Sequence, residues 1–316
     1  MQMLSFRNDD HMPAFGLGTW KSDPGKVYEA VKTAIRLGYR HIDCAPIYGN
    51  EPEVGRAIQE VIDEGLVRRE DLWITSKLWN DAHAPEDVQP ALQKTLDDLQ
   101  LDYLDLYLMH WPVALEKGIP FPKKPEHFVS TDEIPLEATY MAMAQTVHRG
   151  QCRHIGVCNF SIDNLTHLIA KAEYPVEMNQ IELHPYLQQP KMLEFCQQNG
   201  VLLTAYSPLG SKDRPSVMKA DDEPSLFDEP VIKDLAEEKG ASPAQIMIAW
   251  ALHRGTSVIP KSTNPGRIEE NLKATELELS AEDMQRIGQI DRGHRLLVGE
   301  FWAMEGSPYS LADLWG

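Results

Sequence analysis

Features typical of a membrane protein or a nucleic-acid-binding protein are missing from this sequence. No run of about 18 apolar residues occurs, so we expect no membrane-spanning helix. The chain carries 48 acidic and 30 basic residues, which gives a net charge of -18. Broad binding to nucleic acids or to anionic membranes needs a basic surface, so this composition argues against both. It is still compatible with a local basic pocket for a phosphate group.

Cysteine is scarce as well. The four cysteines, Cys44, Cys152, Cys158 and Cys196, form no C-x-x-C pair and no zinc-like spacing with histidine. An H-E-x-x-H pattern is also missing, so we expect no metal site. Reduced thiols are typical of a cytosolic protein. Residues 1–10 show no apolar stretch after their charges, so we expect no signal peptide and predict a cytoplasmic location.

Short apolar runs alternate with longer amphipathic ones along the chain. The helix-like stretches begin after Ser, Asp or Pro and end at Gly, as capping chemistry predicts. Strict alternation of strand and helix is typical of right-handed βαβ units and a parallel sheet. We predict strands at residues 14–20, 39–44, 72–78, 104–110, 152–159, 176–183, 201–207 and 257–262. We predict helices between them at residues 25–38, 51–65, 85–100, 136–150, 161–172 and 190–200.

Eight strands with nearly continuous apolar runs favour a closed (β/α)8 barrel. The length of 316 residues suits either one such barrel or two average domains. A doubly wound open sheet is the competing fold, and its dinucleotide-binding form carries G-x-G-x-x-G after the first strand. Gly16 and Gly18 supply two of these glycines, but Lys21 occupies the third position. We therefore predict an α/β barrel, of TIM-barrel type, formed by residues 1–316 as a single domain.

Two long segments interrupt this alternation. Residues 113–135 follow the fourth predicted strand, and residues 208–230 follow the seventh. Both are rich in proline and polar residues, and loops of this length in a compact domain are usually functional or mobile. The tail after Arg292 is rich in aromatic residues.

Polar side chains stand where three consecutive strands are predicted to end. Asp43 ends the second strand, Lys77 the third and His110 the fourth, each about one βα unit after the last. Tyr48 lies in the loop that the second strand feeds. Active sites of such barrels lie at the carboxyl ends of the strands, so we expect these four residues to meet at one rim. Taken alone, each of these four residues could have a purely structural role. Only their joint placement at one rim indicates a catalytic role.

A phenol, an ammonium, a carboxylate and an imidazole can together protonate a carbonyl oxygen. A phenol with an ordinary pKa of about 10 is a poor proton donor at neutral pH. We expect Lys77 to lower the pKa of Tyr48, and Asp43 to keep Lys77 charged. Neutral His110 can hydrogen-bond the carbonyl oxygen. Because side chains donate no hydride, these residues imply a nicotinamide cofactor.

The chain resembles the aldo-keto reductases, close to their aldehyde and aldose reductase branch. The family's motifs occur in order as GLGTW, GYRHIDCAPIYGNEPEVG, ITSKLW, LDYLDLYLMHWP, GVCNFS, QIELHPY, AYSPLG and IPKS followed by R..EN. The resemblance covers essentially the whole chain. It implies that Asp43, Tyr48, Lys77 and His110 form the catalytic tetrad. It also implies an N-terminal hairpin and a C-terminal tail over the active-site rim.

The resemblance implies NADP(H) as the cofactor. Lys261 and Arg267 support this, because cations beside short polar side chains suit a phosphate. The family commonly has serine where Cys158 stands. The residues expected at the nicotinamide are Cys158, Asn159, Gln180 and, stacked on the ring, Tyr206. Gly18, Thr19, Trp20 and Asp43 are also expected to bind the cofactor. Those expected over the pyrophosphate are Ser207, Leu209 and Ser211. Those expected at the 2′-phosphate and adenine are Lys261, Ser262, Asn264, Arg267, Glu270 and Asn271.

Aromatic residues follow several of the predicted strand ends and are expected to wall the substrate pocket. The pocket residues that we predict are Trp20, Ile47, Tyr48, Trp79, His110, Trp111, Phe301 and Trp302, with Phe121, Phe128 and Leu297 closing it. The alternative is that the tail aromatics pack against the side of the barrel. Ile47 is apolar, whereas a polar residue beside Tyr48 would help to bind a polyol.

We predict an NADPH-dependent reductase of aldehydes and some ketones, with Tyr48 as the general acid. One alternative is a sugar-specific aldose or xylose reductase, and another is a non-catalytic barrel that binds a ligand. The expected partner is a small aldehyde or ketone, without nucleic acid or membrane. The sequence leaves the oligomeric state open, with a monomer expected.

Overall fold

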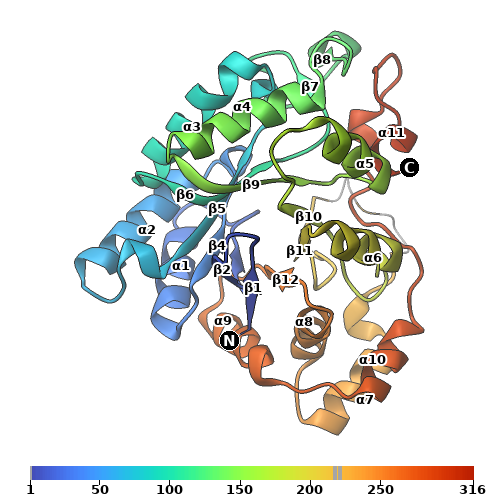
Figure 1. Cartoon of the computed structure of the whole chain (residues 1–316). Coiled ribbons are helices and arrows are strands. Elements are labelled where there is room, and N and C mark those ends of the chain that lie inside the picture. Colours follow the sequence, from blue (N-terminus) through green and yellow to red (C-terminus); the bar gives the residue numbers. More distant parts are fainter. Residues whose placement is uncertain (1, 216–218, 220–222) are drawn as a thin grey trace.

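Eight parallel strands form the centre of the molecule in the computed structural model, which describes residues 2–215, 219 and 223–316 (Figure 1). In spatial order they are β3 (Leu17–Gly18), β4 (His41–Asp43), β5 (Trp73–Leu78), β6 (Leu104–Met109), β9 (Cys152–Cys158), β10 (Met178–Glu182), β11 (Leu202–Tyr206) and β12 (Ser257–Val258). Each lies within one of the eight predicted segments. Strands β5 and β6 are buried at every residue, which explains their nearly continuous apolar runs.

The sheet closes on itself between its first and last strands. The amide of Val258 donates to the carbonyl oxygen of Ala14 at 2.7 Å, and the amide of Gly16 donates to that of Val258 at 3.0 Å. Gly18 lies so close to the last strand that a Cβ atom there would be 2.8 Å from the carbonyl oxygen of Ile259. A side chain would force the two segments apart, so glycine is required at this seam. The prediction of a closed (β/α)8 barrel is confirmed.

Helices surround the barrel (Figure 1). The predicted six correspond to α1 (Lys26–Leu37), α2 (Glu51–Asp63), α3 (Pro85–Leu99), α4 (Leu136–His148), α5 (Ile162–Lys171) and α6 (Pro190–Asn199). They are followed by α7 (Pro230–Lys239), α8 (Pro243–His253), α9 (Pro265–Lys273), α10 (Ala281–Gly288) and α11 (Leu311–Trp315). Short 3-10 helices are η1 (Pro46–Tyr48), η2 (Arg69–Asp71), η3 (Asn80–Ala82), η4 (Pro125–His127), η6 (Leu226–Asp228), η7 (Ala274–Glu276) and η8 (Glu300–Trp302). In the part of the chain that the structure describes, no helix is long and apolar enough to cross a membrane.

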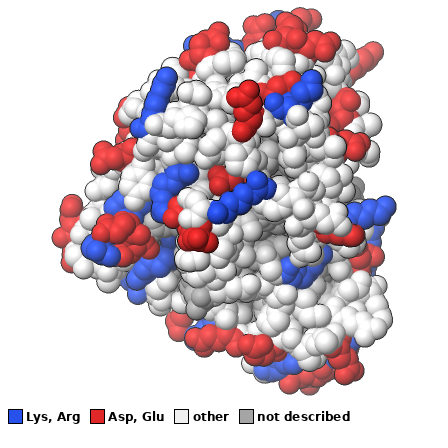
Figure 2. Space-filling model, in the orientation of Figure 1, with Lys and Arg blue, Asp and Glu red and all other residues white. Residues whose placement is uncertain are grey.

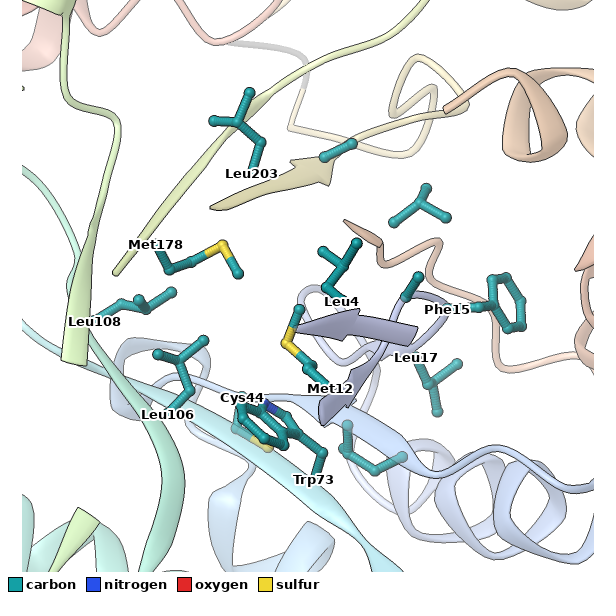
Figure 3. Packing of buried hydrophobic residues seen from close by; sticks show 14 of the residues in the cluster. Leu4, Met12, Phe15, Leu17, Cys44, Trp73, Leu106, Leu108, Met178 and Leu203 are labelled. Atoms are coloured by element: carbon teal, nitrogen blue, oxygen red, sulfur yellow. The ribbon is translucent and has the colours of Figure 1, made fainter. Parts of the chain in front are cut away.

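An N-terminal hairpin, β1 (Met3–Ser5) and β2 (His11–Pro13), covers the amino-terminal end of the barrel. Its buried residues Leu4 and Met12 lie among core side chains of several strands (Figure 3). The connection between its strands is tied down by His154, whose ring nitrogens lie 2.8 Å from Asp10 and 3.1 Å from Glu177. The hairpin thus fills the end of the barrel opposite the predicted active site.

The long segment after β6 contains a small antiparallel hairpin, β7 (Ala114–Leu115) and β8 (Phe128–Val129). No sequence pattern predicted this hairpin, because two-residue strands carry no periodicity. The tail joins this hairpin through Tyr309, whose hydroxyl donates to the carbonyl oxygen of Val129 at 2.6 Å and accepts from the amide of Ala114 at 2.9 Å. The tail therefore lies over the rim as predicted, and not along the side of the barrel.

Candidate active site

Four polar side chains meet where strands β4, β5 and β6 end. Asp43 is the last residue of β4, Lys77 is the last but one of β5, and His110 directly follows β6. These strands pair in parallel, which brings their carboxyl ends to the same rim. Tyr48 reaches this rim from the short helix η1, which begins at Pro46. The four residues predicted to meet are thus brought together, and we refer to them as the tetrad.

Lys77 makes the central contacts of the tetrad. Its Nζ atom donates to Asp43 Oδ1 at 2.5 Å, to the carbonyl oxygen of Cys44 at 2.9 Å and to Tyr48 Oη at 3.4 Å. The side chain has no exposed surface. Burial by itself lowers the pKa of Lys77, but Asp43 and Tyr48 outweigh this effect and hold the pKa above its ordinary value. A charged ammonium therefore lies beside the phenol.

The pKa of Tyr48 lies above its ordinary value, whereas the sequence predicted a lowered one. Burial raises the pKa because it removes water from the phenolate, and Lys77 opposes this rise without overcoming it. The lysine acts in the expected direction. What the sequence did not show is how completely the phenol is desolvated. At neutral pH the phenol is therefore protonated, and its transfer of a proton depends on Lys77 to stabilise the phenolate.

His110 is held neutral. Burial lowers its pKa well below the ordinary value, and the nearby charge of Lys77 lowers it further. Its ring lies with its edge against Trp79, at 5.0 Å between ring centroids, and at 6.0 Å from the ring of Tyr48. A neutral imidazole in this position can hydrogen-bond a carbonyl oxygen near the phenol.

Asp43 is held by contacts from β10 and from the residue that follows β3. Gln180 of β10 donates through Nε2 to Asp43 Oδ2 at 2.7 Å. The hydroxyl of Thr19 donates to the backbone oxygen of Asp43 at 2.8 Å, and Asn50 Nδ2 donates to the backbone oxygen of Thr19 at 2.9 Å. All four residues are buried. Both carboxylate oxygens of Asp43 are therefore engaged, one by Lys77 and one by Gln180.

A second set of polar groups lies beside the tetrad. The hydroxyl of Tyr206, at the end of β11, donates to Asn159 Oδ1 at 2.7 Å, and Asn159 Nδ2 donates to the carbonyl oxygen of His110 at 3.0 Å. The thiol of Cys158 lies 3.7 Å from Gln180 Oε1. Asn159 has a φ of 63° and Ser207 one of 51°, a conformation that is costly for residues with a side chain. Such strain is concentrated at ligand sites, where the rest of the fold maintains it.

A cavity of about 770 Å³ runs from the tetrad to the start of α9. Its lining includes the residues that the sequence predicted to bind cofactor or substrate, from Gly18 to Trp302, with the exception of Phe128 among those predicted to close the pocket. Asp43, Tyr48 and His110 also line it, whereas Lys77 lies behind them without exposed surface. Among the described residues, no group of His, Cys, Asp and Glu is arranged to hold a metal ion.

The end of the cavity away from the tetrad is rich in donors. Lys261 and Ser262 lie just before α9, and Arg267 lies in its first turn. Asn264 caps this helix by accepting from the amide of Arg267 at 3.0 Å. Glu270 and Asn271 of the same helix also line this end. A helix N-terminus beside two cationic side chains is a favourable site for a phosphate group.

The tetrad end is walled by aromatic rings. Trp20, Trp79, Trp111, Phe301 and Trp302 all line it, and the rings of Trp111 and Trp302 meet edge to face at 5.6 Å. Ile47, Phe121 and Leu297 line the cavity too. Phe128 differs, since it packs in the apolar cluster behind this wall and not in the lining.

A comparison with models of known protein families shows which family this chain belongs to. Residues 13–292 match the model of the aldo/keto reductase family. This chain belongs to the aldo/keto reductase family. The resemblance drawn from the sequence is thereby confirmed.

Individual relatives agree with this assignment. Over its whole length the aldo-keto reductase is 50% identical to an aldo/keto reductase of Synechocystis sp., covering 96% of that protein. It is 48% identical over 289 residues to human aldo-keto reductase family 1 member A1, which covers 91% of this chain and 88% of the human protein. The structure of an aldose reductase from Schistosoma japonicum superimposes with a TM-score of 0.88 at 35% identity, over 97% of this chain and 98% of that one.

Sequence reasoning missed part of the lining of this aldo-keto reductase cavity. Asp213 joins two loops by accepting from Lys21 at 2.7 Å and from Lys261 at 3.0 Å. Burial raises the pKa of Asp213, but the two lysines outweigh it and lower the pKa to about 2. The interrupted G-x-G-x-x-G pattern drew attention to Lys21 without assigning it a role, and no pattern singled out Asp213. Other missed lining residues are Pro208, Lys212, Phe227, Ala244, Ile259, Pro260 and Thr263.

Proposed function

We propose that this aldo-keto reductase reduces aldehydes, and some ketones, to alcohols with NADPH. The observation that carries the proposal is the placement of Tyr48, Lys77, Asp43 and His110 at one end of a single cavity whose other end is cationic. Membership of the family supports an oxidoreductase that acts on carbonyl compounds.

The residues present fit NADP(H). The cavity of about 770 Å³ is of the size that ligand sites in proteins have. Lys261 and Arg267 at the start of α9 supply charge for a 2′-phosphate, and the amides of Asn159 and Gln180 supply partners for a carboxamide beside the tetrad. When bound, NADPH supplies a hydride for the carbonyl carbon.

In the proposed reaction Tyr48 gives its proton to the carbonyl oxygen. The buried phenol is protonated at neutral pH, and the ammonium of Lys77, 3.4 Å away, stabilises the phenolate that is left. Asp43 holds this ammonium in place and balances its charge. Neutral His110 orients the carbonyl by a hydrogen bond that strengthens as negative charge develops on the oxygen.

The aromatic wall supports a preference for apolar aldehydes. Burying the apolar part of a substrate contributes about 0.8 kcal/mol per CH₂ group. The same wall offers few partners to sugar hydroxyls, and burying a hydroxyl without a partner is unfavourable. Ile47 beside Tyr48 adds another apolar surface at the tetrad. These observations favour a general aldehyde reductase over the alternative of an aldose or xylose reductase.

Steady-state assays with the purified chain test the proposal. NADPH and NADH would each be combined with benzaldehyde, hexanal, an aliphatic ketone and xylose. We expect NADPH oxidation with the aldehydes, and a higher kcat/KM for benzaldehyde than for xylose, mostly through KM. A higher kcat/KM for xylose would support the aldose reductase alternative. Cofactor binding without turnover of any carbonyl compound would support the non-catalytic barrel and refute the proposal.

A further inference from the structure

Beside the substrate pocket, the backbone of the C-terminal tail is hydrogen-bonded to a single buried carboxylate. Glu182 is the last residue of β10 and has no exposed surface. Its Oε1 atom accepts from the amide of Leu296 at 2.7 Å, and its Oε2 atom accepts from the amide of Leu297 at 2.8 Å. Leu297 lines the cavity, and Phe301 and Trp302 follow it along the same segment. One side chain of the barrel thus holds two successive amides of the pocket wall.

The carboxylate of Glu182 is itself well supported. His184 Nε2 lies 2.9 Å from Oε1, and Gln189 donates to the backbone oxygen of Glu182 at 2.6 Å. Burial raises the pKa of Glu182, but His184 and the tail amides outweigh it, so the pKa lies below its ordinary value. A buried carboxylate is costly unless its oxygens are hydrogen-bonded, and here both are.

The same tail segment is held from its outer side by α11. The indole N–H of Trp315 donates to the carbonyl oxygen of Val298 at 2.7 Å, and the guanidinium of Arg295 lies 3.6 Å from the centre of the Trp315 ring. The segment is therefore fixed between the end of β10 and the C-terminal helix. Its backbone has little freedom to move Leu297 away from the cavity.

Strand β10 also supports the tetrad. Gln180, which donates to Asp43, precedes Glu182 by two residues, and alternate residues of a strand point to the same side. We propose that Glu182 is a positioning residue for substrate selection, because its carboxylate holds the tail backbone so that Leu297 closes the pocket at a fixed distance from the tetrad. This inference rests on the proposed function of the cavity as an aldehyde-binding site.

Glu182→Gln tests the role of the charge with little change in shape. The amide keeps one acceptor oxygen for the tail but turns an N–H group towards the second tail amide. Loss of one hydrogen bond to a charged group predicts a rise in KM for benzaldehyde of about tenfold, with kcat and NADPH affinity changed less than about twofold. Propanal, which is too short to gain much from the wall, should be affected less. The ratio of kcat/KM between the two aldehydes should therefore fall.

Glu177→Gln is the matched control. Glu177 is also buried and directly precedes β10 at its other end. It lies 3.1 Å from His154 Nδ1 and accepts from the amide of Ile155 at 3.3 Å, so the substitution removes the same kinds of contact far from the cavity. We expect a similar loss of stability but an unchanged ratio between benzaldehyde and propanal. Equal losses of discrimination in both variants would show that the effect is general destabilisation, which would overturn the inference.

Amide hydrogen exchange tests the hydrogen bonds between Glu182 and the tail independently of turnover. In the wild type the amides of Leu296 and Leu297 should be protected, and Glu182→Gln should speed their exchange by about tenfold while Glu177→Gln leaves it unchanged. Rapid exchange at both amides in the wild type would contradict the inference even if Glu182→Gln failed to fold. An active Glu182→Gln enzyme with wild-type discrimination would also overturn it and leave the proposed function standing. An inactive wild-type protein with protected tail amides would overturn the proposed function, and with it the role of Glu182 in substrate selection, although the hydrogen bonds from the tail to Glu182 would stand.

Discussion

At the scale of single residues, burial decides what the tetrad can do. Lys77 has no exposed surface, yet it stays charged because Asp43 lies 2.5 Å away. The same burial raises the pKa of Tyr48, and Lys77 opposes this rise because its ammonium stabilises the phenolate. The sequence identified these residue types and their spacing. It could not give the balance between burial and charge, because that balance depends on how the surrounding strands exclude water.

Arg267 provides a test of the cofactor preference. Arg267→Ala removes a cation from the first turn of α9, where we expect the 2′-phosphate. NADPH should bind about tenfold more weakly. This is the lower end of the effect expected when a hydrogen bond to a charged group is lost, because the side chain of Arg267 is exposed. NADH affinity should be nearly unchanged. Fluorescence titration with both cofactors measures this, and Arg286→Ala on α10, outside the cavity, is the control. Equal losses for the two cofactors would mean that Arg267 supports the adenine or the fold.

Glu51, a buried carboxyl group outside the cavity, provides a test of how stability depends on pH. It is buried between β5 and α3, where the hydroxyls of Ser76 and Thr95 donate to its carboxylate at 2.5 Å and 3.3 Å. Burial raises its pKa from 4.5 to about 7. Between these values the folded state holds a proton that the unfolded state has lost. The free energy of unfolding therefore falls as pH rises through this window.

Glu51→Gln removes this ionisation while keeping an acceptor oxygen. Relative to the variant, the wild type should be more stable at about pH 5 than at about pH 8, because only the wild type must bury a charge at the higher pH. Urea unfolding of both proteins at the two pH values measures the difference, and other titrating groups cancel in the comparison. An equal stability difference at both pH values would show that Glu51 does not titrate in this range.

At the scale of elements, local sequence patterns predicted strands and helices. Contacts between residues far apart in the sequence could not be predicted. The eight strands and six of the helices could be predicted because apolar periodicity and capping residues are local properties. The bond from Glu182 to Leu296 spans 114 residues, and the pair of Lys21 with Asp213 spans 192. Neither leaves a pattern in the sequence. The hairpin of β7 and β8 escaped prediction for another reason, because its strands have two residues each.

The tail provides a prediction at this scale. Removing residues 299–316 deletes Phe301 and Trp302 from the wall and Trp315 from the outer side of the tail. The preference for benzaldehyde over propanal should largely disappear through a higher KM, because an open wall buries less of the aromatic ring. NADPH affinity should be retained, since the donors at the start of α9 are untouched. A truncated enzyme that still discriminates between the two aldehydes would show that Trp20, Trp79 and Trp111 suffice.

At the scale of the whole molecule, an acidic protein concentrates a few cations where a phosphate is expected. Figure 2 shows acidic side chains spread over one face with lysines and arginines among them, in keeping with a net charge of -18. Lys21, Lys261 and Arg267 by contrast gather along one cavity. The family assignment and the barrel are established. Organisation as a single domain over residues 1–316, a monomeric state and a cytoplasmic location stay predictions.

The central claim is that hydride reaches a carbonyl carbon in this cavity while Tyr48 supplies the proton. Its most direct test is single-turnover reduction of benzaldehyde with NADPH that carries deuterium at the transferable position, for the wild type and for Tyr48→Phe. The wild type should give benzyl alcohol with deuterium on carbon. Tyr48→Phe should bind NADPH normally but react at least about a hundredfold more slowly, because the ring remains and the general acid is lost. Deuterium-free alcohol, or a near-wild-type rate in Tyr48→Phe, would contradict the claim.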